Sequence, residues 1–255
     1  MSNVFYAPGE QRTAKVKDLF AAIARRYDLL NDLQSFGLHR YWKRRVAELA
    51  AVKSGDRALD LCCGTGDIAF ALAQRGAEVI GLDFSREMLA VAETRSQNKN
   101  PTSDLRPLTS VFRPPTFCQG DAQQIPFSDA SFDIVTVGYG LRNLAGWETG
   151  LAEMRRVATP GARLVVLAFD KPPNALWRAI YFVHLRCSVP LIGRLFCGNA
   201  GAYAYILESL KHYPAQQAVA DKMRELKLTN VRVINLLGGA MAINYGEKRR
   251  GCQAG

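Results

Sequence analysis

A short run near position 60 combines glycines and acids in the pattern of a nucleotide-binding turn. The run over 59–67 reads LDLCCGTGD and places Gly64 and Gly66 after a short apolar strand. Glycines in such a turn let a ligand approach the backbone, because no Cβ stands in the way. Seventeen residues after Gly66, Asp83 ends a second predicted strand, where a carboxylate can bind both hydroxyls of a ribose.

The turn lacks the fingerprint of a nicotinamide dinucleotide site. That fingerprint, G-x-G-x-x-G, needs a third glycine, and the acid at Asp67 would obstruct the amides that a pyrophosphate requires. A cofactor with ribose and adenine but no phosphate fits better, and S-adenosylmethionine is that cofactor. Asp121, which ends a third predicted strand, would accept a hydrogen bond from the adenine amino group. Gly138, just after the strand over 132–137, would lie beside the methionine end.

These residues fall at strand ends because strands and helices alternate across 57–169. Predicted strands cover 57–61, 78–83, 117–121, 132–137 and 163–169, with helices over about 67–75, 86–95 and 146–157. This alternation predicts a doubly wound α/β sheet with mostly parallel strands.

The segments on either side differ from this core. An amphipathic helix over 13–33 and a second helix over about 41–51 predict an N-terminal helical cap over 1–53. The core follows over 54–170, and 171–255 holds a helical insertion near 175–210 and the final strands, all within a single domain over 1–255.

The stretch 175–198 is apolar, but three arginines (Arg178, Arg186 and Arg194) interrupt it and Pro190 is expected to break it. Charges at that frequency argue against a membrane span. Packed core helices and an element that lies on a membrane surface both fit this composition.

The net charge of +10 is carried by the two ends of the chain. Residues 1–53 carry +5, 54–170 carry −3 and 171–255 carry +8, and no acid occurs from Lys171 to Leu207. This distribution fits an anionic partner, either phospholipid or nucleic acid, and equally fits a solubilising surface.

The apolar fraction of 48% and the charged fraction of 22% are those of a globular protein and exclude disordered and disulfide-scaffold classes. None of the six cysteines forms a CxxC pair, which argues against a metal site and for reduced thiols. The first residues hold no apolar stretch of signal-peptide length, so a cytoplasmic location is expected.

The chain resembles the ubiquinone/menaquinone biosynthesis C-methyltransferases over nearly its whole length. The matching runs are RYDLLND (26–32), SFGLHR (35–40), WKR (42–44), LDLCCGTGD (59–67), GLDFSREML (81–89), IPF (125–127), GYGLRN (138–143) and GGAMA (238–242). YDLLND and GLRN are specific, since generic methyltransferases lack both.

The resemblance implies the class I S-adenosylmethionine-dependent methyltransferase fold, which is Rossmann-like with a seven-stranded sheet. Together with the glycine turn it gives the candidate cofactor residues Gly64, Thr65, Gly66, Asp83, Met88, Asp121, Ala122 and Gly138. Three features depart from the family pattern. Gly138 stands where relatives often carry serine, 99–116 looks like an insertion, and Gly239-Ala240-Met241 differs from the usual glycine-glycine-methionine-threonine order.

The chemistry that the resemblance implies needs an ionised substrate. A quinol carbon becomes nucleophilic enough when the neighbouring hydroxyl loses its proton, and a fixed cation favours that loss. Arg142 is the candidate cation, and Asn143 could orient the hydroxyl or a water. Tyr27 and Asp28 would close the site from the N-terminal helix. His39 and His212 could serve as bases, although lone histidines are more often structural.

The acceptor that fits best is a polyprenylated naphthoquinol, demethylmenaquinol, because CCGTGD and GLDFSREML are closer to menaquinone-type relatives. A polyprenyl benzoquinol of ubiquinone biosynthesis and another small aromatic acceptor remain alternatives. We expect no nucleic-acid partner, since the basic ends hold no RNA-module signature. An inactive membrane scaffold is disfavoured by the intact glycine turn. A peripheral contact with an anionic membrane surface is expected, and self-association is left open.

Overall fold

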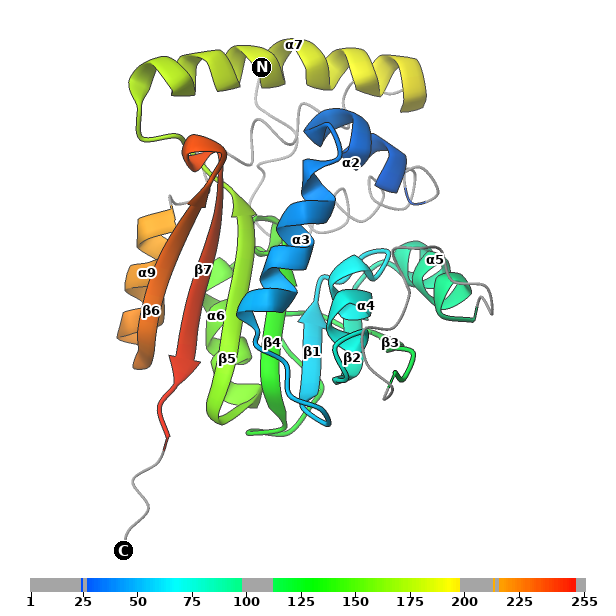
Figure 1. Ribbon diagram of the computed structural model, residues 1–255, viewed down its shortest axis with the longest axis vertical. Coiled ribbons are helices and arrows are strands. Elements are labelled where there is room, and N and C mark those ends of the chain that lie inside the picture. The colour runs from blue at the N-terminus through cyan, green and yellow to red at the C-terminus, as the bar shows by residue number, and fades with distance from the viewer. Residues whose placement is uncertain (1–23, 25–26, 98–111, 198–212, 214–215, 251–255) are drawn as a thin grey trace, which may run out of the picture.

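Figure 1 shows the computed structural model of the chain, which describes residues 24, 27–97, 112–197, 213 and 216–250. For Leu30 and for 188–197 it describes the backbone alone. Most of the predicted insertion at 99–116 lies outside these residues, since only 112–116 of it are described. His212 and the segment 13–23 of the first predicted helix also lie outside them.

One seven-stranded sheet forms the centre of the molecule, in the order β3-β2-β1-β4-β5-β7-β6. Its strands are β1 (Arg57–Leu61), β2 (Glu78–Asp83), β3 (Thr116–Gln119), β4 (Phe132–Gly138), β5 (Ala158–Phe169), β6 (Leu228–Leu236) and β7 (Met241–Lys248). β1 to β5 pair in parallel, whereas β7 runs antiparallel between β5 and β6. The sheet predicted from the family resemblance is confirmed.

Helices cover both faces of the sheet (Figure 1). They are α2 (Tyr27–Ser35), α3 (Leu38–Leu49), α4 (Asp67–Ala73), α5 (Arg86–Gln97), α6 (Trp147–Val157), α7 (Ala175–Cys197) and α9 (Gln216–Glu225), with short 3-10 turns η3 (Leu141–Asn143) and η4 (Leu237–Gly239). Side chains alternate across each strand, so that Ile134 packs with Val46 and Ile68 of α3 and α4. Its neighbour Val135 packs on the other face with Met154 of α6. Both faces are therefore buried, as in other parallel sheets.

Two predicted boundaries are corrected. The second N-terminal helix begins at Leu38 instead of 41, because Gly37 adopts a left-handed backbone (φ 76°) that allows a tight turn between α2 and α3. The third strand ends at Gln119, so Asp121 lies in the loop two residues beyond the strand and does not end it.

The expected break at Pro190 is wrong. α7 continues through this position as one helix of 23 residues. A proline removes one backbone hydrogen bond from a helix and can kink it, which need not end the helix. Among the described helices, none combines the length and the apolar character that crossing a membrane requires.

Candidate active site

The glycine turn lies at the carboxyl end of β1, and its backbone needs glycine. Gly64 and Gly66 both have positive φ (56° and 89°), and Gly66 is the N-cap of α4. A Cβ on Gly66 would come within 3.0 Å of the rings of Phe70 and Phe117. The two glycines thus permit a left-handed turn and the close packing of α4 against the sheet.

Asp83, the last residue of β2, reaches the same turn. Its Oδ2 accepts a hydrogen bond from the Gly64 backbone N–H (2.8 Å) and its Oδ1 one from Ser85 N–H (2.9 Å). Burial raises the pKa of Asp83, and these backbone donors partly offset that effect. A carboxylate can accept about four hydrogen bonds, so Asp83 keeps capacity to accept one from a ligand hydroxyl. Met88 Cε is 3.5 Å from the position of a Cβ on Gly64, so the structure brings Gly64, Asp83 and Met88 together.

A charge cluster built around the buried Lys43 surrounds the start of α4. Asp67 pairs with Lys43 Nζ of α3 (2.7 Å) and with Arg95 of α5 (2.8 Å), and Arg95 also donates to the Thr65 carbonyl (2.7 Å). Burial would raise the pKa of Asp67, but the two cations hold it well below its usual range. Burial would lower the pKa of Lys43, but Asp67 keeps it raised. A carboxylate therefore already occupies the first turn of α4, which suits a cofactor without phosphate groups.

α2 lies against this turn through Tyr27 and Asp28, which the sequence predicted to close the site. The Thr65 hydroxyl, which is buried, donates a hydrogen bond to Asp28 Oδ1 (2.9 Å). Tyr27 Cε1 is 4.0 Å from the position of a Cβ on Gly64. In this arrangement the Thr65 hydroxyl uses its proton in the hydrogen bond to α2. Only the lone pairs of its oxygen remain, and these could accept a hydrogen bond from a cofactor.

Three further candidate residues lie along the same edge of the sheet. Asp121 is exposed, and its Oδ1 accepts the backbone N–H of Gln123 (2.8 Å), while Ala122 is buried. A Cβ on Gly138 would stand 2.5 Å from Ile68 Cδ1. A larger residue at position 138 would therefore require the end of the Ile68 side chain to move.

Arg142 and Asn143 lie in η3, directly after the end of β4. Arg142 is buried, with its guanidinium carbon 5.1 Å from the centre of the Phe169 ring. Burial raises the pKa values of Tyr139 and Tyr181, and the charge of Arg142 partly offsets that rise. Arg142 therefore already favours the ionised form of phenols near it.

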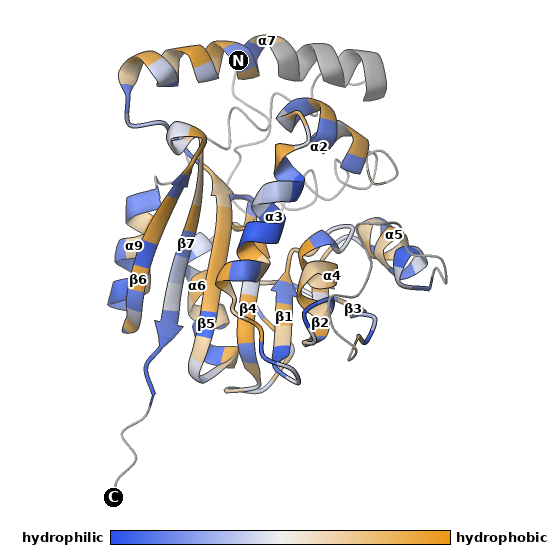
Figure 2. Cartoon of the chain, viewed as in Figure 1, coloured by the Kyte–Doolittle hydropathy of each residue, from blue (hydrophilic) through white to orange (hydrophobic). Residues whose placement is uncertain are grey.

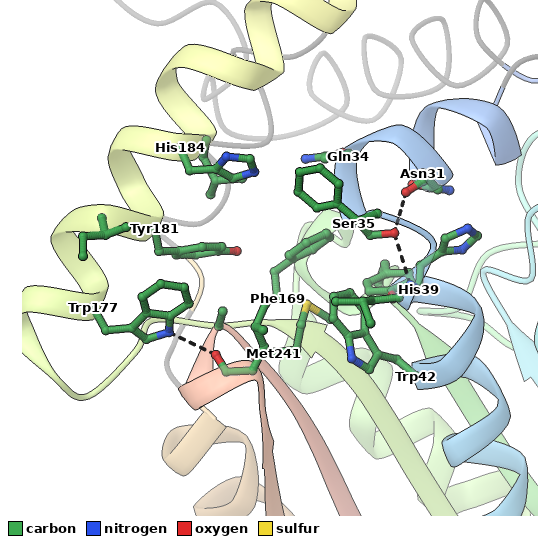
Figure 3. A pocket seen from close by; sticks show the side chains of 17 residues that line it. Asn31, Gln34, Ser35, His39, Trp42, Phe169, Trp177, Tyr181, His184 and Met241 are labelled. Atoms are coloured by element: carbon green, nitrogen blue, oxygen red, sulfur yellow. Dashed lines mark hydrogen bonds between the residues drawn. The ribbon is translucent and has the colours of Figure 1, made fainter.

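An apolar pocket opens next to this edge, between α2, α3 and α7 and above the ends of β5 and β7 (Figure 3). Its volume is about 330 Å³. The lining residues are Asn31, Gln34, Ser35, Phe36, Leu38, His39, Trp42, Tyr139, Phe169, Trp177, Ile180, Tyr181, His184, Leu185, Leu237, Ala240 and Met241. Tyr139 follows Gly138 in the chain, so the pocket adjoins the predicted methionine end of the cofactor site. Arg142 packs against Phe169, and Phe169 lines the pocket.

Sequence reasoning missed several of these residues. Tyr139 lies in the GYGLRN run and Lys43 in the WKR run. Both runs indicated the family, but neither residue was predicted to belong to the site. Tyr181 and Trp177 belong to the apolar stretch 175–198, where nothing in the sequence distinguishes a pocket wall from a core residue. Within the described ranges no cluster of three or more His, Cys, Asp or Glu could hold a metal ion.

Comparison with known proteins places this architecture in a family. The sequence profile of the ubiE/COQ5 methyltransferase family matches residues 9–248. The chain belongs to this family. It is therefore an enzyme, a methyltransferase whose cofactor is S-adenosylmethionine.

Curated relatives cover nearly the whole chain. A demethylmenaquinone methyltransferase of Thermus thermophilus is 41% identical over 90% of this chain and 100% of its own length. Another of Desulfitobacterium hafniense is 38% identical (95% and 93%). A ubiquinone/menaquinone biosynthesis C-methyltransferase of Azotobacter vinelandii is 36% identical (94% and 92%).

Solved structures agree on the fold. A S-adenosylmethionine-dependent methyltransferase from Thermotoga maritima superimposes with a TM-score of 0.61 at 17% identity, covering 91% of this chain and 99% of that one. A second such protein, from Methanococcus maripaludis, gives a TM-score of 0.58 at 16% identity and covers 91% and 94%. At these identities the likeness concerns the fold alone, and it confirms the class I architecture.

Proposed function

We propose that the enzyme methylates a ring carbon of a polyprenylated quinol, with demethylmenaquinol as the acceptor and menaquinol as the product. The observation that carries this proposal is the apolar pocket beside Gly138 and Tyr139, whose volume of about 330 Å³ suits an aromatic head group. The names of the curated relatives support quinone ring methylation and include both the menaquinone and the ubiquinone pathways.

The cofactor would bind along the carboxyl edge of the sheet. Asp83 would accept hydrogen bonds from the ribose hydroxyls, and Gly64 and Gly66 would leave room for the ligand at the turn. Asp121 would receive the adenine amino group, with Met88 and Ala122 as apolar neighbours. When bound, S-adenosylmethionine supplies an electrophilic methyl group on a sulfonium sulfur.

The chain's own residues would prepare the acceptor. Arg142 would favour the ionised hydroxyl of the quinol, as it favours the ionised form of the tyrosines around it. The acceptor hydroxyl loses this proton before methyl transfer. After the transfer the methylated ring carbon loses its hydrogen as a proton and the oxygen regains one, so that both hydroxyls are restored and one proton is released overall. Asn143 would orient the hydroxyl, and Tyr27 and Asp28 would keep water away from the reacting atoms.

Quinone profiling tests the choice of acceptor. The gene is expressed in a host that lacks its own quinone C-methyltransferase, and the lipid extract is analysed by mass spectrometry. We expect methylated naphthoquinone to accumulate. Methylated benzoquinone alone would favour the ubiquinone alternative, and no methylated quinone would point to another small aromatic acceptor.

We also propose that the pocket opens toward a membrane surface. Large apolar side chains are exposed on the α2–α3 turn, α7 and η4, and Figure 2 colours much of the described part of α7 as hydrophobic. They are Phe36 (80% exposed), Leu176 (72%), Val183 (61%), Ile180 (51%) and Leu237 (48%), and three of them, Phe36, Ile180 and Leu237, also line the pocket. Arg178 and Arg186 of α7 are exposed beside them. Apolar side chains rimmed by basic ones are typical of an interfacial element.

Vesicle sedimentation tests this surface. The protein should bind phosphatidylglycerol vesicles at low salt and be released as salt is raised, because each surface cation contributes about 1 kcal/mol at most. Replacing Arg178 and Arg186 by glutamine should weaken binding. Replacing Arg249 and Arg250, exposed beyond the far end of β7, is the matched control and should change nothing. Equal binding to neutral and anionic vesicles would contradict the electrostatic part.

A further inference from the structure

Several polar atoms in the apolar pocket are buried without a hydrogen-bond partner. Among the described residues nothing pairs with Gln34 Nε2, His39 Nδ1 or the hydroxyls of Tyr139 and Tyr181. Buried polar groups in proteins are almost always paired, because an unpaired one loses its hydration without compensation. When such atoms gather around one pocket, a bound ligand is the natural source of the missing partners.

The two tyrosine hydroxyls are the most informative of these atoms, since they come from different walls. Tyr139 belongs to the junction between β4 and η3, and Tyr181 to α7. Figure 3 shows Tyr181 extending from α7 into the pocket toward Phe169. The Tyr139 ring lies 5.1 Å from the Phe169 ring, centre to centre. Phe169 thus lies between the two walls.

The backbone at Tyr139 is held in an unfavourable conformation. Its φ of 62° lies in the left-handed region, which a bulky residue seldom adopts. A backbone hydrogen bond from Tyr139 N–H to Leu167 O (2.7 Å) keeps it there. Strain of this kind is common where a side chain must be aimed at a ligand.

Both hydroxyls keep their protons at neutral pH. Burial raises the pKa of Tyr139 and of Tyr181 above the ordinary value for tyrosine, although Arg142 opposes the rise in both. A protonated phenol can donate one hydrogen bond and accept another. It can therefore pair with a ring oxygen in either its hydroxyl or its ionised form.

We infer that Tyr139 and Tyr181 bind the ring oxygens of the acceptor from two sides of the pocket, and so select an aromatic ring that carries two oxygens. This assignment rests on the proposed function, in which the acceptor is a quinol. Tyr139, which follows Gly138, holds the oxygen nearer the cofactor edge, and Tyr181 holds the other. The apolar walls, including Trp42 and Met241, contact the carbon skeleton of the ring.

The test measures binding of head-group probes to the full chain with S-adenosylhomocysteine present. The probes are 1,4-naphthalenediol, kept reduced, and naphthalene, which has the same rings without oxygens. Quenching of tryptophan fluorescence reports binding, because Trp42 and Trp177 line the pocket. The variants are Tyr139→Phe, Tyr181→Phe and the double variant. Tyr213→Phe is the matched control, because its hydroxyl is also buried and unpaired but lies outside the pocket lining.

We expect each pocket variant to bind the diol about fivefold to tenfold more weakly and naphthalene unchanged, and the double variant to lose its preference for the diol. Tyr213→Phe should bind both probes like the parent. Because the removed hydroxyls have no hydrogen-bond partner among the described residues, no variant should melt at a lower temperature than the parent. Two results would overturn the assignment. In one, both single variants bind the diol as tightly as the parent does. In the other, they lose affinity for the diol and for naphthalene to the same extent.

The same proteins separate this inference from the proposed function. If the parent methylates quinones in the profiling host and the Phe variants bind the diol normally, the tyrosine assignment is wrong while the function stands. If the parent methylates no quinone and shows no preference for the diol over naphthalene, both are wrong.

Discussion

The two halves of the active site differ in how their polar groups are satisfied. On the cofactor side, Asp83 is held by backbone N–H groups and Asp67 by two cations from other helices. On the acceptor side, the hydroxyls of Tyr139 and Tyr181 have no partner in the described chain and face an apolar cavity. One half is organised by the protein alone, whereas the other lacks what an acceptor would supply.

This difference has an energetic meaning. Groups that are already paired need no reorganisation when a ligand arrives, which favours tight binding of an invariant cofactor. Unpaired groups lower the stability of the free protein and regain that energy when the acceptor binds. Substitutions on the cofactor side should therefore cost stability, whereas on the acceptor side they should cost recognition.

The largest effect is expected at Asp60, which breaks the pattern of the cofactor side. Asp60 is buried in β1; one oxygen accepts from the Thr136 hydroxyl (2.7 Å), while Oδ2 has no partner in the described chain. Burial raises its pKa from 3.8 to about 7. The folded protein therefore keeps a proton that the unfolded chain releases, and the free energy of unfolding should fall by about 4 kcal/mol between pH 3 and pH 8.

Asp60→Asn removes this slope. Urea unfolding at about pH 4 and pH 8 should show similar stability for the two proteins at the lower pH and a more stable variant at the higher pH. A stability difference that is the same at both pH values would show that Asp60 titrates normally.

Asp67 should show the cost of breaking the buried charge cluster. Asp67→Asn leaves Lys43, whose side chain is 8% exposed, without its carboxylate partner. We expect the free energy of unfolding to fall by about 3 kcal/mol or more. Asp129→Asn, which breaks an ion pair with Arg156 where the aspartate is 77% exposed, is the matched control and should cost less than about 1 kcal/mol. If both variants lost a similar free energy of unfolding, the Asp67 cluster would be no more important for stability than an exposed ion pair.

Asp83 should affect the affinity for the cofactor. Asp83→Ala should weaken S-adenosylmethionine binding by about 2 kcal/mol, roughly thirtyfold, because hydrogen bonds to a charged group are lost. Titration calorimetry measures this on a variant whose circular dichroism matches the parent. Undiminished affinity in a folded variant would exclude Asp83 as the ribose anchor.

Arg142 should affect the rate of methyl transfer. Arg142→Lys keeps a charge but loses the planar guanidinium over Phe169, and we expect kcat to fall about tenfold with little change in KM. Arg142→Ala should move the pH optimum of kcat upward, because the quinol then ionises at its higher, unassisted pKa. A normal rate with an unmoved pH profile would assign Arg142 a structural role.

The cofactor side was largely predictable from sequence and the acceptor side was not. Gly64, Gly66 and Asp83 come from neighbouring strand ends, so motif spacing and the parallel sheet are enough to bring them together. The charge cluster was missed because Lys43 and Asp67 are 24 residues apart on two helices whose packing no local pattern shows. The pocket unites α2, α3, α7 and η4, which depend on long-range packing of apolar residues with no distinguishing spacing.

In the proposed function, where the acceptor is a polyprenylated quinol, the position of the pocket mouth has a consequence for the length of the isoprenoid tail. A cavity of about 330 Å³ takes a fused-ring head group and leaves no room for a long hydrocarbon chain. Because Phe36 and Ile180 both line the cavity and are exposed at its rim, the tail would leave between them into the surrounding lipid. The enzyme should then contact only the first prenyl unit of the tail, and its activity should not depend on the number of further units. One such protein could serve cells whose quinones differ widely in tail length.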